Sequence, residues 1–277
     1  MNIHPTAIIS PDARLADDVN VGSYAVIEGP VSVGAGTVIH AHAKLRGPLT
    51  MGKGNTVHSF ASLGDWPQDR KFKGDFSETV IGDENVFREY STVHRGTVAN
   101  SKTVVGNRCY FMVGSHAGHN CVVEDDAMLV NGAALGGHVQ VGKRAMIGAY
   151  SAVHQFCRVG RLAMITNHAG FNMDMPPFFI SMKINTVTQL NAVGLRRSGM
   201  PKESINALRR MFQIAFRENR RRPLATALAQ LPADLKAVPE IQELMAFVKA
   251  TKRGVATFAP WGHRRESSQG EGGSEGE

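Results

Sequence analysis

The sequence predicts an all-β solenoid of short strands, followed by a small C-terminal helical domain. Residues 105–170 divide into consecutive blocks of six with no remainder. An aliphatic or aromatic residue opens nearly every block, and a small residue usually fills the fifth place. After Phe171 this period ends, and apolar residues recur at helical spacing. Self-similarity at a short fixed period is typical of solenoids, whose units bury their apolar faces only by stacking.

The six-residue register starts at Ile3 and predicts a β-helix over residues 1–171, interrupted by loops at 64–80 and 99–104. Three flat faces of six residues make a coil of 18 residues, and strands stacked on one face lie about 4.8 Å apart. We therefore expect a triangular prism of roughly eight or nine coils. The first loop is long and charged, which favours a function over a simple solvated corner.

The rest of the chain divides into a helical domain over residues 172–260 and a tail over 261–277. Apolar stripes predict helices over 187–197, 201–221, 224–230 and 241–250. The tail is acidic and low in complexity, so we expect it to be disordered.

Composition limits the function classes. The start of the chain lacks the pattern of a signal peptide, and no window is apolar enough for a membrane span, so we expect a cytoplasmic protein. The three cysteines, Cys109, Cys121 and Cys157, fall at the fifth place of their blocks, where we expect buried, inert thiols. The net charge of +7 equals the surplus of nine bases over two acids within residues 186–222. This local basic patch predicts an anionic partner.

A row of histidines is the main candidate for chemistry. His119 lies 19 residues before His138 and 35 before His154, so an 18-residue coil places all three near one edge. His94 joins the row once the second loop is subtracted, and His116 is close by. None occupies the first or fifth place of its block, so we expect them to project outward. Two uses remain open: a zinc site, or a general base with substrate-orienting neighbours.

The ordered motifs now resemble a known family. HAGHNC (116–121), LGGHV (135–139), AVHQFC (152–157), VHRGT (93–97), QDRKFKGD (68–75), MPPFF and NAVGLRRSGM are similar to those of UDP-N-acetylglucosamine 3-O-acyltransferases, the first enzymes of lipid A synthesis. The similarity runs from about Ile3 to Ala259. It implies a left-handed parallel β-helix, a C-terminal helical domain and a homotrimer with active sites between neighbouring prisms.

The resemblance also implies residue roles. His119 matches the general base that deprotonates the sugar 3-hydroxyl as it attacks the thioester of a (R)-3-hydroxyacyl group. Gly137 matches the residue whose backbone N–H faces the oxyanion, and Asn120 takes the place that orients the base. Matches to substrate-binding positions are Gln68, Asp69, Lys71, His94, His116, His138, His154, Gln155, Asn191, Arg196 and Arg197. Asn167 falls where the acyl-chain ruler ends, and a side chain there favours a shorter acyl chain.

Three positions depart from the family pattern. Asn120 stands where family members commonly carry Asp, Val193 where they carry Glu, and Ser198 where a second Arg is usual. An amide still orients an imidazole but does not stabilise an imidazolium as a carboxylate does. We therefore expect nucleotide recognition to differ more from the family than acyl transfer.

The expected partners follow from the same resemblance. The basic helical patch suits acyl carrier protein, an acidic partner, and the acyl donor is carried on its phosphopantetheine, so neither a further cofactor nor a metal is expected. Nucleic acid is a poorer match because the patch lacks interleaved aromatic residues.

Three other functions remain open from the sequence. One is the same chemistry on a 3-amino nucleotide sugar. Another is a γ-carbonic-anhydrase-like zinc enzyme that uses the histidines as ligands. The third is an inactive hexapeptide scaffold, which the departures at Asn120 and Val193 favour.

Overall fold

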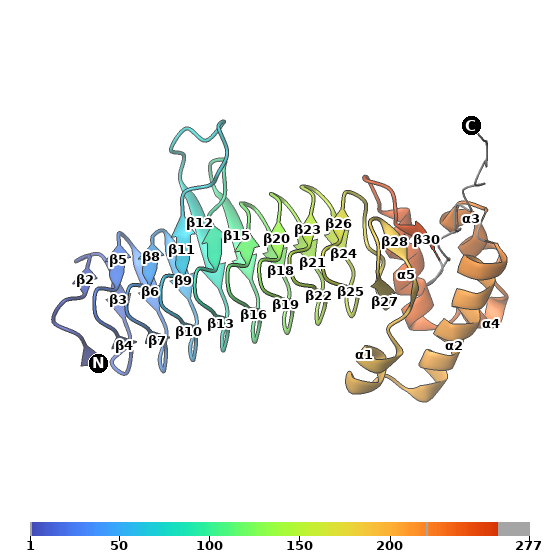
Figure 1. Cartoon of the computed structure of the whole chain (residues 1–277), viewed down its shortest axis with the longest axis horizontal. Coiled ribbons are helices and arrows are strands. Elements are labelled where there is room, and N and C mark those ends of the chain that lie inside the picture. Colours follow the sequence, from blue (N-terminus) through green and yellow to red (C-terminus); the bar gives the residue numbers. More distant parts are fainter. Residues whose placement is uncertain (1, 220, 260–277) are drawn as a thin grey trace, which may run out of the picture.

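The structure is a computed structural model that describes residues 2–219 and 221–259. A long three-sided prism of short strands carries a group of helices at its C-terminal end (Figure 1). The chain visits three sheets in fixed order, here called sheets A, B and C, so three strands make one coil. All their strands pair in parallel except the last of sheet A, which is antiparallel to its neighbour. The prism is a left-handed parallel β-helix, as the resemblance implied.

Sheet A is the longest. Its strands, in spatial order, are β1 (Asn2–Ile3), β4 (Asn20–Val21), β7 (Val38–Ile39), β10 (Thr56–Val57), β13 (Val86–Phe87), β16 (Tyr110–Phe111), β19 (Met128–Leu129), β22 (Met146–Ile147), β25 (Met164–Ile165), β27 (Phe179–Ser181) and β29 (Gln189–Leu190).

Sheets B and C form the other two faces. Sheet B contains β2 (Ile8–Ile9), β5 (Val26–Glu28), β8 (Lys44–Arg46), β11 (Ser62–Asp65), β14 (Thr92–His94), β17 (His116–Ala117), β20 (Ala134–Leu135), β23 (Ala152–Val153) and β26 (Gly170–Phe171). Sheet C contains β3 (Arg14–Leu15), β6 (Val31–Val33), β9 (Leu49–Met51), β12 (Ser77–Ile81), β15 (Ser101–Val105), β18 (Val122–Val123), β21 (Gln140–Val141) and β24 (Arg158–Val159).

The register confirms the 18-residue coil. Ile3 pairs with Val21, and Val21 pairs with Ile39. The block-opening residues and the small fifth-place residues point inward, including all three cysteines, which are buried and free. Burial raises the pKa of Cys121 to about 12, so this thiol is inert, as predicted.

The two interruptions are shorter than the periodicity predicted. Strands β12 and β15 pair in register over five residues, from Ser77 with Ser101 to Ile81 with Val105. Both strands therefore extend into segments that looked like loop, because each gives the other's backbone a hydrogen-bonding partner. What protrudes between β11 and β12 is residues 66–76 (Figure 1).

The helices differ from the predicted ones mainly at their starts. They are α1 (Ala192–Arg197), α2 (Lys202–Phe212), the π-helical continuation η1 (Gln213–Glu218), α3 (Leu224–Ala229), α4 (Ala233–Lys236) and α5 (Pro239–Lys249). The predicted helix over 187–197 is wrong in its first half. β28 (Thr186–Val187) pairs there with β30 (Thr257–Phe258), and β29 adds to sheet A, so strand pairing overrides the helical pattern.

No helix in residues 2–219 and 221–259 is long and apolar enough to cross a membrane. The predicted tail over 261–277 lies outside the described residues.

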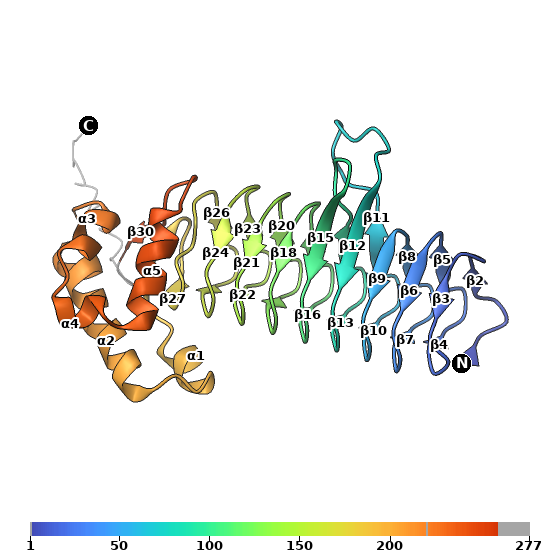
Figure 2. The same ribbon diagram turned by 180° about the vertical axis from the view of Figure 1, so that it is seen from behind.

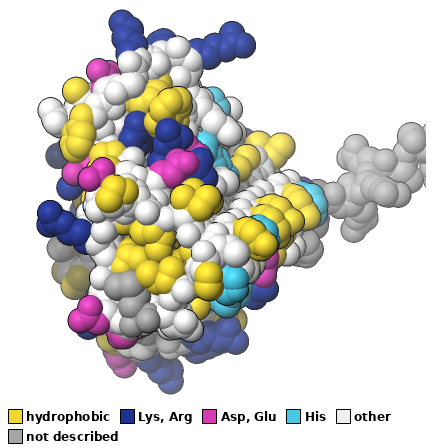
Figure 3. Space-filling model, turned by 90° about the vertical axis from the view of Figure 1, so that its left-hand side faces the viewer, with side chains coloured by type: hydrophobic (Ala, Val, Ile, Leu, Met, Phe, Trp, Pro, Cys, Tyr) yellow, Lys and Arg dark blue, Asp and Glu magenta, His cyan; other side chains and the backbone are white. Residues whose placement is uncertain are grey.

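Each edge of the prism carries its own kind of side chain. The aromatic edge, between sheets A and B, stacks Tyr24, His42, Phe60 and Tyr90 at centroid distances of 5.1 to 5.2 Å. Figure 3 shows hydrophobic and histidine side chains in a row along the prism. The ion-pair edge lies between sheets C and A, and the histidine edge between sheets B and C.

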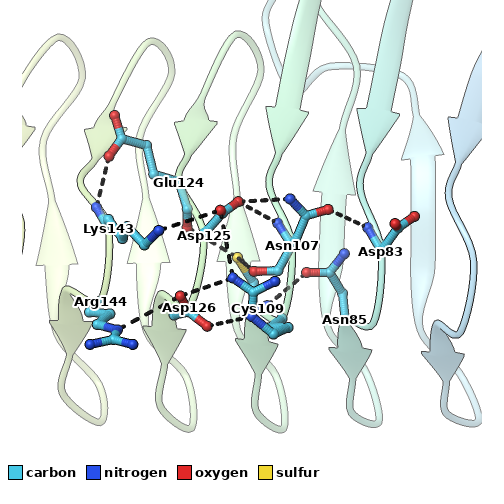
Figure 4. Close-up of polar contacts among 10 residues, drawn as sticks. Asp83, Asn85, Asn107, Cys109, Glu124, Asp125, Asp126, Lys143 and Arg144 are labelled. Carbon is cyan, nitrogen blue, oxygen red and sulfur yellow. Dashed lines mark hydrogen bonds and ion pairs between the residues drawn. The ribbon is translucent and has the colours of Figure 1, made fainter. Parts of the chain in front are cut away.

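The ion-pair edge satisfies its own polar groups (Figure 4). The Asp125 carboxylate accepts hydrogen bonds from the backbone N–H and the amide of Asn107. Arg108 donates twice to Asp126, at 2.8 and 3.1 Å. Each acceptor receives hydrogen bonds from the neighbouring coil, so these contacts hold adjacent coils together.

Candidate active site

A cavity of about 690 Å³ lies at the histidine edge, near the protruding segment. It gathers seven of the predicted residues, which are Gln68, His94, His116, His119, Gly137, His154 and Gln155. Its floor on sheet B is made of the small outward residues Ala134, Ala152 and Gly170. The cavity therefore combines imidazoles at one side with a shallow apolar surface that suits a hydrocarbon chain.

His119 is held in one tautomer. The Asn120 side-chain oxygen accepts from the backbone N–H of Thr97 at 3.2 Å and from its hydroxyl at 3.0 Å. Because a backbone N–H only donates, the amide atom facing Thr97 must be the oxygen. The same oxygen lies 2.9 Å from Nδ1 of His119, so in the neutral ring Nδ1 carries the proton and Nε2 keeps its lone pair. The amide thus orients the His119 ring, although it adds no negative charge.

Gly137 lies directly beneath the ring of His119. A Cβ on Gly137 would lie 2.3 Å from Cε1 and 2.4 Å from Nε2 of that ring. Its backbone N–H donates no hydrogen bond among the described residues. The glycine therefore makes room for the His119 ring, and its N–H is available beside that ring.

His94 and His116 lie deeper than expected. The prediction that the whole row projects outward is wrong for His94, which is only 7% exposed. Its Nδ1 is buried without a partner among the described residues. The rings of His94 and His116 meet edge to face, and Thr92 Oγ1 lies 2.7 Å from Nδ1 of His116.

Burial keeps these rings neutral. It lowers the pKa of His116 to about 4, with further lowering from the positive charges that His94 and His119 would carry. Burial likewise lowers the pKa of His94, although the Asp65 carboxylate opposes it. At neutral pH both rings therefore serve as hydrogen-bonding groups rather than as charges.

His138 belongs to a different hollow. Its ring meets the ring of His119 edge to face at 5.2 Å and stacks on Phe156 at 4.7 Å. It does not line the cavity around His119 but a second hollow of about 620 Å³ on the sheet C side. The row predicted from the sequence is thus divided between two hollows.

The protruding segment brings only one of its three predicted residues to the cavity. Gln68 lines it, whereas Asp69 and Lys71 do not. The Asp69 carboxylate accepts the backbone N–H of Lys71 at 2.9 Å. It also opposes the burial that lowers the pKa of His138, so its charge reaches the histidine edge.

The predicted nucleotide residues lie elsewhere on the chain. Asn191 caps α1 by accepting the Gly194 N–H, and its amide donates to the Leu162 carbonyl on the ion-pair edge. Arg144 on the same edge donates to the Ser198 carbonyl just after α1. In two opposite views α1 and the protruding segment lie on opposite sides of the prism (Figures 1 and 2). Within one chain, Asn191, Arg196 and Arg197 are therefore not brought to the His119 cavity.

Asn167, the predicted end of the acyl ruler, is exposed and does not line the cavity. Its side-chain oxygen accepts the Ala149 N–H at 2.8 Å, which ties two coils together.

Sequence reasoning missed Thr97, Thr92 and the floor residues. The floor could have been predicted, because Ala134, Ala152 and Gly170 are spaced by 18 residues and therefore stack on successive coils. No comparable signal marks the two threonines, whose roles depend on side-chain geometry. Among residues 2–219 and 221–259, no cluster of three His, Cys, Asp or Glu is arranged to hold a metal ion.

Known proteins match both parts of the chain. Residues 174–256 match the family described as Udp N-acetylglucosamine O-acyltransferase; Domain 2. Among solved structures, the UDP-N-acetylglucosamine O-acyltransferase of Moraxella catarrhalis aligns with a TM-score of 0.85 at 35% identity, covering 92% of this chain and 100% of that one. The enzyme of Bacteroides fragilis gives 0.86 at 33% identity, covering 91% and 99%.

Curated relatives match over nearly their whole length. An acyl-[acyl-carrier-protein]–UDP-N-acetylglucosamine O-acyltransferase of Sulfurihydrogenibium is 48% identical over 94% of this chain and 96% of its own. The protein of that name from Trichlorobacter lovleyi is 44% identical over 92% and 99%. Because these relatives are 44 and 48% identical over more than nine tenths of both chains, and the folds agree, the chain belongs to the UDP-N-acetylglucosamine O-acyltransferase family.

Proposed function

We propose that the chain transfers a (R)-3-hydroxyacyl group from acyl carrier protein to the 3-hydroxyl of UDP-N-acetylglucosamine, the first step of lipid A synthesis. The observation that carries this proposal is the fixed tautomer of His119, whose Nε2 lone pair faces a cavity with an apolar floor. Relatives of this family supply the names of both substrates.

The chemistry follows from this geometry. Nε2 of His119 takes the proton of the sugar hydroxyl as its oxygen attacks the thioester carbon. The Gly137 N–H stabilises the charge that develops on the carbonyl oxygen. As the carbon–sulfur bond breaks, the imidazolium returns the proton to the leaving thiolate. The acyl group arrives activated as a thioester, so no further cofactor is needed.

The acyl chain is proposed to lie on the floor made by Ala134, Ala152 and Gly170. Asn167 is the proposed end of this groove, as the family resemblance implies. Because Asn167 does not line the cavity of its own chain, a second copy is proposed to complete the groove.

A homotrimer is proposed for the same reason. α1 lies beside the ion-pair edge, away from the cavity of its own chain, so Asn191, Arg196 and Arg197 serve a cavity only if they belong to a neighbour. The aromatic edge supports self-association, because Tyr24, Phe60 and Tyr90 are 48 to 61% exposed.

Acyl carrier protein is proposed to dock on the basic patch. Eight of its nine bases lie in the described residues, and all eight are exposed. They are Arg196, Arg197, Lys202, Arg209, Arg210, Arg217, Arg221 and Arg222. Such a surface attracts an acidic carrier, and the attraction weakens with salt.

The test is a transfer assay with a mixed-length pool of (R)-3-hydroxyacyl carrier proteins, offered UDP-N-acetylglucosamine or its 3-amino analogue. Wild type should acylate the 3-hydroxyl, and His119→Ala should lower kcat by about 10² to 10⁴. The variant should bind the nucleotide sugar normally, because His119 acts on the proton. Equal rates in the two proteins would show that His119 is not the base. Exclusive use of the amino sugar would show that the acceptor is the 3-amino group and not the 3-hydroxyl.

A further inference from the structure

We propose that the second hollow, behind His138, is a phosphate-ester site in which Lys252 and Arg253 hold one substrate during transfer. The identity of that substrate rests on the proposed function. The hollow itself rests on the geometry of the segment that follows α5. Its lining residues are His138, Gln140, Phe156, Arg158, Asp174, Ala250, Lys252 and Arg253.

The hollow adjoins the reaction centre. His138 contacts the ring of His119 on one side and lines the hollow on the other. Nη2 of Arg253 lies 3.3 Å from Nδ1 of His154, a residue of the His119 cavity, and 3.4 Å from the Asn172 carbonyl oxygen. A ligand in the hollow would therefore lie next to the His119 cavity, because two residues that line the hollow contact residues that line the cavity.

The segment that carries the two cations is fixed to the prism. The Gly254 carbonyl accepts a hydrogen bond from the Asp174 N–H at 2.8 Å, and the Ala256 N–H donates to the Asp174 carbonyl at 2.9 Å. The Thr251 hydroxyl donates to the Asp174 carboxylate at 2.8 Å. Lys252 and Arg253 thus extend from a pinned turn, which lowers the entropy lost when they bind a ligand.

The charge of the hollow is positive. Asp174, its one carboxylate, is 1% exposed and is fully engaged by Arg158, which donates at 3.0 and 2.7 Å. That pair is neutral overall. Lys252 and Arg253 are exposed, and neither has a carboxylate partner among the described residues. Burial lowers the pKa of His138, so this ring adds no charge at neutral pH. Two cations therefore remain for a ligand.

The chemistry of these groups selects phosphate. A guanidinium pairs with two phosphate oxygens and an ammonium with a third, while Phe156 offers an apolar surface for the rest of the ligand. Both proposed substrates carry such a group: the diphosphate of the nucleotide sugar and the phosphodiester of the pantetheine arm. The shared ligand chemistry is a phosphate ester.

The test uses the full-length Lys252→Ala, Arg253→Ala and double variants, with Lys53→Ala as a control that removes one exposed charge far from the hollow. KM is measured separately for the acyl carrier and for the nucleotide sugar. We expect KM for one of them to rise about tenfold in each single variant and about a hundredfold in the double, with kcat within twofold. A rise for the carrier alone assigns the site to the pantetheine phosphodiester, and a rise for the nucleotide alone assigns it to the diphosphate.

A binding measurement separates this proposal from the proposed function. Inorganic pyrophosphate is titrated calorimetrically into wild type and the double variant, which requires no turnover. Binding at least tenfold weaker in the double variant supports the site even if wild type transfers nothing. Equal pyrophosphate binding, or a fall in kcat with both KM values unchanged, overturns the proposal, because Arg253 would then act only through His154.

Discussion

The histidine edge and the ion-pair edge are built from the same coil but are used in opposite ways. On the ion-pair edge, Asp125 and Asp126 receive donors from the adjacent coil, so the polar groups are satisfied within the chain. On the histidine edge, Nδ1 of His94 and the N–H of Gly137 are left without partners among the described residues. Unsatisfied groups cost stability, and they are tolerated where a ligand uses them.

A regular scaffold can thus assign stability to one edge and chemistry to another. Neighbouring coils bind each other through one edge and leave another edge free for the substrates of the proposed reaction. Substitutions on the ion-pair edge should therefore change stability without changing rate, and those on the histidine edge should do the reverse, apart from effects of burial.

The largest expected effect concerns the buried rings of the histidine edge. Because the folded-state pKa of His116 is lowered to about 4, the unfolded chain binds more protons between pH 4 and 6.5. The free energy of unfolding should therefore fall by up to about 3 kcal/mol as pH drops through this window. Above pH 6.5 the contribution of the neutral ring is fully present. Denaturant unfolding at several pH values should show this slope in wild type and a shallower one in His116→Gln. Parallel curves would contradict the assignment.

The next effect concerns the space beneath the base. Gly137→Ala should displace the His119 ring and lower kcat about 10- to 100-fold, a loss of about 1.4 to 2.7 kcal/mol of transition-state stabilisation. In a His119→Ala background the same substitution should cost almost nothing, because the clashing ring is gone. A double-mutant cycle of transfer rates measures this coupling, and additive losses would show that Gly137 acts independently of the ring.

A smaller effect is expected on the ion-pair edge. Asp125→Ala removes the acceptor of two Asn107 donors and should cost about 1 to 2 kcal/mol of unfolding free energy. The kcat and KM values should match wild type. Loss of activity at unchanged stability would break the division between the two edges.

The smallest effect belongs to the exposed pair. Asp126→Asn weakens its bidentate contact with Arg108, whose side chain is 47% exposed, and should lower the free energy of unfolding by less than Asp125→Ala does. The difference should shrink as salt is raised, which thermal unfolding in a salt series will measure. A cost that persists in high salt would indicate that geometry, and not charge, matters here.

The sequence predicted those features that depend on the repeat. The 18-residue coil, the buried cysteines and the neighbouring positions of His119 and His138 follow from counting residues. The separation of His138 from the His119 cavity does not, because it depends on which way each ring turns at the edge. Arg253 was also beyond reach, since it meets His154 across 99 residues through packing against Asp174. The prediction that a helix begins near residue 187 was wrong, because residues 186–187 pair with β30, which is distant in sequence.

The insertion between β11 and β12 has an evolutionary consequence. Val57 pairs with Phe87, 30 residues later, and Phe87 pairs with Phe111, 24 residues later, yet the stacking on either side is undisturbed. Extra segments of twelve and six residues leave the core unchanged because they emerge at a turn, where closing a longer loop costs little. New recognition segments arise in such a fold by local duplication or insertion at one turn, without redesign of the interior. The protruding segment can therefore change in length or sequence without a matching change in the interior of the prism.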